Sequence, residues 1–160
     1  MLFRSGIEDG PTYTQLRIGP RGPEVMEVAA RLGGGHDAEL VEAAVGVDLN
    51  GLALAAALGE PLTPGQVTTC YKPRVGGAVM RFLVAPPGTL ESVEVPDDLP
   101  GVVRVRIYRS PGDVIAPLRR GTDRSGAVLA LGSSREEALA RADSAAERIR
   151  FVTADAEALV

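Results

Sequence analysis

The sequence predicts an α+β protein in two parts, and three patterns support this fold class. Residues 10–31 are typical of two strands joined by a turn rich in glycine and proline, and two short helices follow. Residues 102–108 alternate between apolar and other side chains, which is the period of a strand. Residues 134–149 carry an apolar stripe at helical spacing. We therefore expect antiparallel strands with helices in residues 1–72 and a small α+β domain in residues 73–160.

The first part begins with a predicted hairpin. Its strands are Gly10–Ile18 and a second strand running from Glu24 to Arg31, with the turn at residues 19–23. Because successive side chains of a strand point to opposite faces, Glu27, Ala29 and Arg31 should project to one side. The side chains expected on the other side are Met26, Val28 and Ala30.

Two helices are expected after the hairpin. The first spans Asp37–Val45, and the second is the apolar run Leu49–Leu58. At ten residues this run is too short for a membrane span of about 20 residues, so we interpret it as a buried helix. Asp48 is its expected N-cap, and Gly59 lies at its C-terminal end. Residues 60–65 break the helix, and Gln66–Lys72 could form a strand in either part.

The second part should contain several strands and one long helix. The helix is predicted after Ser134, where the spacing to Glu137 matches a capping box. Its apolar stripe comprises Ala138, Leu139, Ala142, Ala145, Ala146 and Ile149. The expected strands are Gly77–Val84, Leu90–Val95, Val102–Tyr108, Ala127–Leu131 and Phe151–Val152. In the third of these strands, the valines and isoleucine at 103, 105 and 107 should share one face.

Composition excludes several classes of protein. A net charge of −4 leaves no basic footprint for nucleic acid. The single cysteine, Cys70, excludes an internal disulfide framework and fits a reducing compartment, so a cytoplasmic location is expected. The sequence shows neither a signal peptide at its start nor an apolar run long enough for a membrane helix.

The charged side chains of the hairpin are the candidate functional residues. Glu27 and Arg31 are expected on one side of a strand, and Gln15 in the other strand could lie beside Glu27. A carboxylate and a guanidinium facing the same space suit a bound metal and an anion. A surface salt bridge across the sheet is the alternative. The glycines at 33, 34 and 35 either let a backbone approach a ligand closely or form a flexible turn.

At the level of motifs, the sequence resembles a known family. The motif Gly10-Pro-x-x-Thr-Gln-Leu16, followed by Glu27-Val-x-Ala-Arg-Leu-Gly-Gly34, is similar to the C-terminal end of an ATP-grasp core. The resemblance is strongest to carboxylate–amine ligases of the L-amino-acid ligase type, with biotin carboxylase as a more distant relative. Residues 76–88, 111–115, 123–132 and 136–141 look like that family's C-terminal domain.

The resemblance implies a domain organisation. Residues 1–72 would be the C-terminal portion of the ATP-grasp catalytic domain, and residues 73–160 the family's C-terminal domain. The segments that enclose the nucleotide in this family would precede residue 1. We therefore interpret the chain as a fragment of a ligase that is inactive by itself, with Met1–Ser5 either native or foreign sequence.

The resemblance also implies chemistry. Such ligases use ATP and Mg²⁺ (or Mn²⁺) to join a carboxylate to an amine through an acyl phosphate. Glu27 would be the main metal ligand, and Gln15 occupies the position of a second acid, while Ala29 stands where many relatives carry asparagine. Arg31 would be the catalytic arginine facing the substrate carboxylate and acyl phosphate.

Further contacts and partners follow from the same resemblance. Gly33 and Gly34 would approach the nucleotide, and His36 either contacts substrate or is a surface residue at the helix start. The expected partners are small-molecule carboxylate and amine substrates, and a homodimer is compatible with the family. Two alternatives stay open: a non-catalytic binding module, and part of a biotin-carboxylase-like enzyme that uses bicarbonate. The sequence does not identify the acid or the amine.

Overall fold

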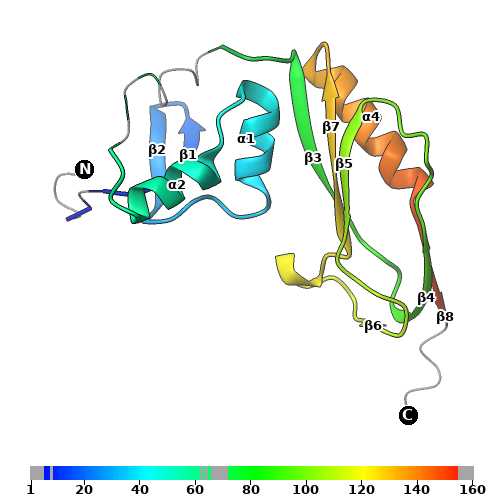
Figure 1. Ribbon diagram of the computed structural model, residues 1–160. Coiled ribbons are helices and arrows are strands. Elements are labelled where there is room, and N and C mark those ends of the chain that lie inside the picture. Colours follow the sequence, from blue (N-terminus) through cyan, green and yellow to red (C-terminus); the bar gives the residue numbers. More distant parts are fainter. Residues whose placement is uncertain (1–5, 8, 62, 64, 66–71, 155–160) are drawn as a thin grey trace. The chain divides into compact units, whose positions relative to one another are not determined.

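The computed structural model describes the chain except for residues 1–5, 8, 62, 64, 66–71 and 155–160. It has two compact units, Met1–Arg74 and Val75–Val160, whose elements are labelled in Figure 1. The mixture of antiparallel strands and helices confirms the α+β class. Cys70, Met1–Ser5 and most of the expected strand Gln66–Lys72 lie outside the described residues. The assignment of the two parts as catalytic and C-terminal domains stays a prediction.

Unit 1 contains a two-stranded antiparallel sheet, as expected. Strand β1 (Tyr13–Gly19) pairs with β2 (Gly22–Ala29) through a two-residue turn, Pro20-Arg21. Gly22 closes the turn at a φ of +100°, a left-handed conformation that glycine adopts without steric cost. The second strand ends two residues earlier than expected, so Arg31 follows the strand instead of lying in it.

A β-bulge interrupts the hairpin. Gln15 is opposite Glu27, whereas the next residue of β1, Leu16, is opposite Val25, so Met26 has no cross-strand partner in β1. This register assigns Met26 to neither face, so the expectation that it shares a face with Val28 stays a prediction. Directly opposed residues share a face, and the register separates a polar from an apolar face. The polar face carries Tyr13, Gln15, Arg17, Glu24, Glu27 and Ala29, and the apolar face carries Thr14, Leu16, Ile18, Pro23, Val25 and Val28.

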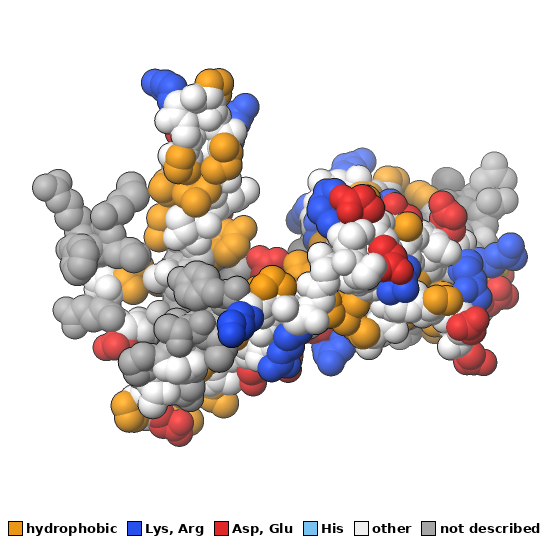
Figure 2. Space-filling view, turned by 90° about the horizontal axis from the view of Figure 1, so that it is seen from above, with side chains coloured by type: hydrophobic (Ala, Val, Ile, Leu, Met, Phe, Trp, Pro, Cys, Tyr) orange, Lys and Arg blue, Asp and Glu red, His pale blue; other side chains and the backbone are white. Residues whose placement is uncertain are grey.

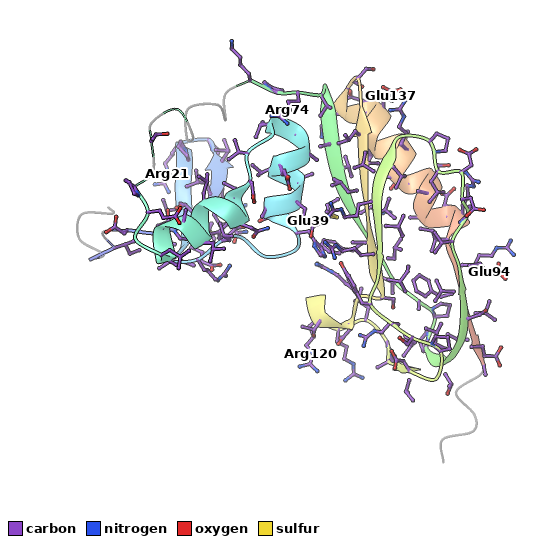
Figure 3. All side chains as sticks on the ribbon, viewed as in Figure 1. Arg21, Glu39, Arg74, Glu94, Arg120 and Glu137 are labelled. Carbon is purple, nitrogen blue, oxygen red and sulfur yellow. The ribbon has the colours of Figure 1, made fainter. Side chains whose placement is uncertain are left out.

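The two helices of unit 1 begin and end close to where the sequence predicts. Helix α1 spans Asp37–Val45 and α2 spans Leu49–Ala57. The Asp48 carboxylate accepts a hydrogen bond of 2.8 Å from the amide of Gly51, as an N-cap should. Gly59 follows α2 in the left-handed conformation, at a φ of +74°. Arg74 returns to the end of α1, where its amide donates to the carbonyl of Ala44 at 2.8 Å (Figure 3).

The expectation that the second helix is buried is wrong. No residue of α2 is buried, and Leu54 and Leu58 are exposed. The other elements described in unit 1 are too few to cover the helix on all sides. No single helix among the described residues is long and apolar enough to cross a membrane. Helices α1 and α2, which are bent by 116° relative to each other, together have the length and composition of a broken span, and this rests on length and composition alone.

Unit 2 contains two three-stranded antiparallel sheets. One has the order β3-β7-β5, formed by β3 (Gly77–Leu83), β7 (Gly126–Gly132) and β5 (Val102–Ile107). The other has the order β6-β4-β8, formed by β6 (Val114–Ile115), β4 (Gly88–Glu94) and β8 (Arg150–Ala154). The sequence missed β6 because two residues show no periodicity. A short 3₁₀ helix, η3, spans Gly121–Asp123.

The long helix of unit 2, α4 (Arg135–Arg148), packs on β3 and β7. Three alanines of its predicted stripe, Ala138, Ala142 and Ala145, are buried, because small side chains let the helix approach the sheet closely. The core beneath it includes Val128 and Leu83, both buried. Beside this core, the buried hydroxyl of Ser125 accepts a hydrogen bond from the amide of Ala85 at 3.1 Å.

A second bulge changes which side chains of β5 face the core. The register shifts between Val102 and Arg104, so Val103 is displaced from the ladder. Val103 is exposed, whereas Val102, Val105 and Ile107 pack against the core. The expectation that Val103 shares the core face is therefore wrong.

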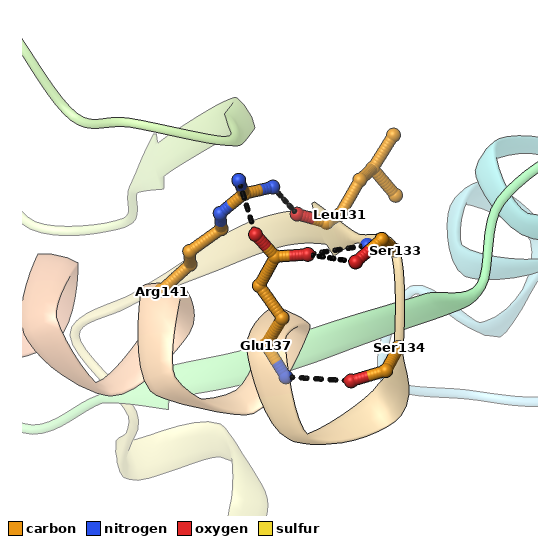
Figure 4. Close-up of polar contacts among 5 residues, drawn as sticks. All are labelled: Leu131, Ser133, Ser134, Glu137 and Arg141. Carbon is orange, nitrogen blue, oxygen red and sulfur yellow. Dashed lines mark hydrogen bonds and ion pairs between the residues drawn. The ribbon is translucent and has the colours of Figure 1, made fainter.

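The predicted capping box before α4 is half correct. The Ser134 hydroxyl accepts from the amide of Glu137 at 3.2 Å, as expected of an N-cap (Figure 4). The Glu137 carboxylate accepts hydrogen bonds from the amide and the hydroxyl of Ser133, the residue before the N-cap, each at 2.6 Å. It also pairs with Arg141 at 2.6 Å. The carboxylate thus reaches one residue further back than in the standard motif.

Candidate functional site

The candidate site lies on the polar face of the hairpin. Antiparallel pairing places Gln15 directly opposite Glu27, as predicted, and both residues are exposed. Opposed side chains of an antiparallel pair lie about 5 Å apart at Cβ and can bind one ligand together. The hairpin therefore brings an amide oxygen and a carboxylate to a common point.

Arg31 joins this pair from the segment that follows β2. Its guanidinium forms an ion pair of 3.2 Å with the Glu27 carboxylate, and the two side chains are 56% and 47% exposed. It also donates to the carbonyl of Leu32 at 3.0 Å and lies 5.7 Å from the centre of the Tyr13 ring. An exposed pair of this kind stabilises a fold by at most about 1 kcal/mol, so it holds Arg31 in place without contributing much to stability.

The two glycines proposed to approach a nucleotide differ in their surroundings. A Cβ on Gly33 would overlap the Asp37 carboxylate and lie 2.9 Å from the Tyr13 ring. A side chain at position 33 would therefore have to displace the side chains of Asp37 and Tyr13. A Cβ on Gly34 would have no atom within 4 Å. Contact of either glycine with a nucleotide stays a prediction.

His36 sits at the N-terminus of α1 in the left-handed conformation, with a φ of +66°. Its Nδ1 atom lies 3.0 Å from a carboxylate oxygen of Glu39, in the first turn of the same helix. The imidazole is partly buried. Its expected contact with substrate stays a prediction.

Sequence reasoning missed a pocket in unit 1. The pocket has a volume of about 470 Å³, within the range of small-molecule sites. Its wall is largely apolar, with the Asp37 side chain among the few polar groups. It is lined by Gly10, Pro11, Thr12, Tyr13, Leu32, Gly33, Asp37, Leu40, Val41, Leu49, Leu52, Ala53 and Ala56. No local motif could have revealed it, because these residues come from separate segments that meet only in the folded unit.

The donor atoms on the polar face fit part of a magnesium site. Magnesium is commonly held by one or two carboxylates together with waters and the phosphates of a substrate. Glu27 and Gln15 offer one charged and one neutral oxygen donor, whereas Ala29 offers none. Among the described residues no group of three or more histidines, cysteines, aspartates or glutamates could hold a metal by itself. The pair suits an ion shared with a phosphate, not an enclosed structural metal.

The sequence is similar to a known domain family and to a bacterial protein. Residues 81–154 match the L-amino acid ligase C-terminal domain 2 family. An uncharacterized protein, y4rH, of Sinorhizobium fredii (strain NBRC 101917 / NGR234) is 37% identical over 139 residues, which are 83% of this chain and 27% of that protein.

Two solved structures show the same fold. The L-amino acid ligase of Bacillus licheniformis has a TM-score of 0.74 at 26% identity, over 94% of this chain and 39% of that one. The biotin carboxylase domain of the Hydrogenobacter thermophilus 2-oxoglutarate carboxylase, solved with MgADP and bicarbonate, has a TM-score of 0.65 at 21% identity. That match covers 88% of this chain and 31% of the domain.

The fold is that of part of an ATP-grasp protein. Within that class, the chain is similar to the ligases of the L-amino acid ligase type, because residues 81–154 match the family of their C-terminal domain 2. The chain spans between about a quarter and two-fifths of the length of these relatives.

Proposed function

We propose that these 160 residues serve in an ATP- and magnesium-dependent ligase that joins a carboxylate to an amine through an acyl phosphate. The observation that carries the proposal is the cross-strand pair of Gln15 and Glu27 with Arg31 bound beside it. The match of residues 81–154 to the L-amino acid ligase C-terminal domain 2 also supports the proposal. The likeness to the biotin carboxylase domain supports the fold alone, so the bicarbonate alternative has no support at the level of residues.

Each side chain has a role that follows from its chemistry. Glu27 and Gln15 would hold magnesium, which when bound neutralises phosphate charge. Gln15 adds an oxygen without charge, so binding should be weaker than with two carboxylates. Arg31 keeps its positive charge and offers a planar, two-pronged contact to a carboxylate or phosphate. Its ion pair with Glu27 fixes the side of the hairpin on which that contact is made.

The proposal is tested in a protein that carries these residues together with the rest of the ligase. Glu27→Gln and Arg31→Lys should each lower kcat for ADP release about a hundredfold, as loss of an oriented charge contact does. Glu27→Gln should also raise the magnesium concentration needed for half-maximal activity. Kinetic measurement of ADP release at varied magnesium checks both.

The hairpin itself offers a matched control. Arg21 and Glu24 form another exposed arginine–glutamate ion pair, at 2.9 Å, next to the turn. Glu24→Gln should leave kcat within about twofold of the wild-type value, because this ion pair is surface-exposed and contributes little.

One observation favours a second candidate, a non-catalytic binding module. Ala29 places no donor atom on the polar face, and Glu27 already has a cationic partner in Arg31. Near-normal turnover in both Glu27→Gln and Arg31→Lys would contradict the ligase roles and leave this module as the better description.

A further inference from the structure

Arginine side chains are concentrated in one stretch of unit 2. Residues 109–124 contain four arginines and two aspartates, in a chain whose net charge is −4. On the face of unit 2 that Figure 2 displays, by contrast, Lys and Arg side chains are interspersed with Asp and Glu side chains. Like charges that lie close together repel each other, so a cluster of arginines is stabilised when an anion binds among them.

An open pocket lies at this stretch. Its volume is about 800 Å³, and it is lined by Ala116, Pro117, Arg119, Arg120 and Asp123. The Arg120 side chain, beside η3 in Figure 3, is 81% exposed, and its Nε atom lies 3.7 Å from the nearer Asp123 oxygen. The Arg119 side chain is exposed and forms no ion pair within the described part of the chain. Both guanidiniums therefore have donors available for a ligand.

The Asp123 carboxylate organises the pocket without neutralising it. Its Oδ2 atom accepts hydrogen bonds from the amides of Arg119 and Arg120, each at 2.9 Å. These hydrogen bonds lower the pKa of Asp123, and the positive charges of Arg120 and Arg109 lower it further. The ionised carboxylate thus fixes the backbone that carries both arginines. Three guanidiniums near one carboxylate leave two positive charges uncompensated, which matches the charge of a phosphate group at neutral pH.

Arg109 places a further positive charge next to this pocket. One of its Nη atoms donates a hydrogen bond to the carbonyl of Thr122 at 3.1 Å, which holds the guanidinium against η3. Its Nε atom is buried and has no hydrogen-bond partner among the residues that the structure describes. A buried cationic donor without a partner is costly, and an anion bound nearby offsets that cost electrostatically.

We propose that Arg119 and Arg120, backed by Arg109, form a binding site in unit 2 for an anion that carries a phosphate group. The planar guanidinium offers two parallel donors to phosphate oxygens and keeps its charge at any physiological pH. The bound group comes from free phosphate or from the phosphate tail of a nucleotide, which present the same oxygens. The proposed metal and substrate residues of the hairpin do not line this pocket, so the proposal is independent of the proposed function.

The test is binding of inorganic phosphate to the full 160-residue chain. Titration calorimetry in a chloride background should show saturable binding that weakens as the salt concentration rises. The double variant Arg119→Ala/Arg120→Ala should weaken binding by more than about tenfold, because charge-assisted contacts are lost. Arg148→Ala/Arg150→Ala is the matched control, because it removes the same charge from exposed arginines elsewhere in unit 2. Its affinity should stay within about twofold of the wild-type value.

A second measurement follows Arg109 directly. The NMR signal of its Nε–H group should shift on addition of phosphate, with the same half-saturation concentration as the heat of binding. ADP without magnesium is titrated in parallel. Tighter binding of ADP than of phosphate, lost in Arg119→Ala/Arg120→Ala, would support a nucleotide tail as the ligand, and equal or weaker binding would support free phosphate.

Three outcomes would each overturn the proposal. They are the absence of saturable phosphate binding, equal weakening of binding in the control double variant, and an Arg109 Nε–H signal that does not respond to phosphate. Urea unfolding of both double variants checks that they are folded, so that a loss of binding is attributed to the arginines themselves.

Discussion

At the scale of single residues, Glu137 shows how one carboxylate can organise a helix start. It accepts hydrogen bonds from the Ser133 hydroxyl and amide and pairs with Arg141, which in turn donates to the Leu131 carbonyl at 2.7 Å. The Ser133 hydrogen bonds, joined by the positive charge of Arg141, lower the pKa of Glu137 below its usual 4.5. The carboxylate thus ties the end of β7 to the first turn of α4 (Figure 4).

A lowered pKa makes this contribution dependent on pH. A group whose pKa is lower in the folded state stabilises the fold above its unfolded pKa and loses that effect as pH falls through the folded value. We expect Glu137→Gln to reduce the urea midpoint above pH 4.5 and to have a smaller effect at more acidic pH. Urea titrations at a series of pH values check this, with Glu147→Gln at the other end of α4 as the control. An effect of Glu137→Gln that is constant with pH would contradict the linkage.

Gly33 gives a second prediction at this scale. In Gly33→Ala the new methyl group would overlap the Asp37 carboxylate and crowd the Tyr13 ring. We expect destabilisation of about 1–3 kcal/mol, the usual result of overpacking. The change should appear as faster hydrogen exchange of the α1 amides. In Gly34→Ala the new methyl group has no atom within 4 Å, so the α1 amides should exchange at the wild-type rate.

At the scale of elements, the bulge in β5 determines which valine supports the core of unit 2. Val102 packs against the core cluster, whereas its neighbour Val103 is displaced and exposed. A strand with strict alternation would have placed Val103 with Val105 and Ile107. The bulge therefore moves the apolar contribution of this strand by one residue.

This shift predicts unequal effects of the same substitution. Val102→Ala should lower the free energy of unfolding by about 1–2 kcal/mol, because two methyl groups of a partly buried side chain packed against the core are lost. Val103→Ala should change it by less than about 0.5 kcal/mol, as expected at the surface. Equilibrium urea unfolding of the two variants measures the difference. The reverse order would mean that β5 alternates without a bulge in solution.

At the scale of the whole molecule, the two units differ in how much interior they contain. The core clusters around Val128 and around Leu90 belong to unit 2. Unit 1 contributes the hairpin, two short helices and the pocket of about 470 Å³. The unit with the candidate chemistry is thus the one with the smaller buried core among the described residues.

This difference predicts that the 160-residue chain does not act as a ligase by itself. The chain spans only 39% of the related L-amino acid ligase, and its described part has two candidate oxygen donors on the polar face. We expect no release of ADP above background from purified residues 1–160 with ATP, magnesium and mixtures of amino acids. A coupled assay for ADP measures this, and acid- and amine-dependent release by the chain alone would falsify the prediction.

Much of the local structure could be predicted from the sequence because its causes lie within a few residues. Alternating side chains and a glycine–proline turn produce the hairpin, and the Asp48 side chain caps α2 by binding an amide three residues ahead. These features need only the periods of strand and helix and the chemistry of caps. The pairing of Gln15 with Glu27 is not of this kind, because the two-residue turn alone would place Gln15 opposite Met26 and the bulge shifts the pairing by one residue.

Only the tertiary structure decided the rest. The bulges beside Gln15 and Val102 depend on how each strand pairs with its partner, and no residue type at these positions predicts them. The pocket and the crowding around Gly33 arise where separate segments of unit 1 converge. The exposure of α2 and of the apolar hairpin face is likewise a property of what packs against them. Burial depends on contacts between distant segments, whereas a sequence pattern reports only which side chains would gain from burial.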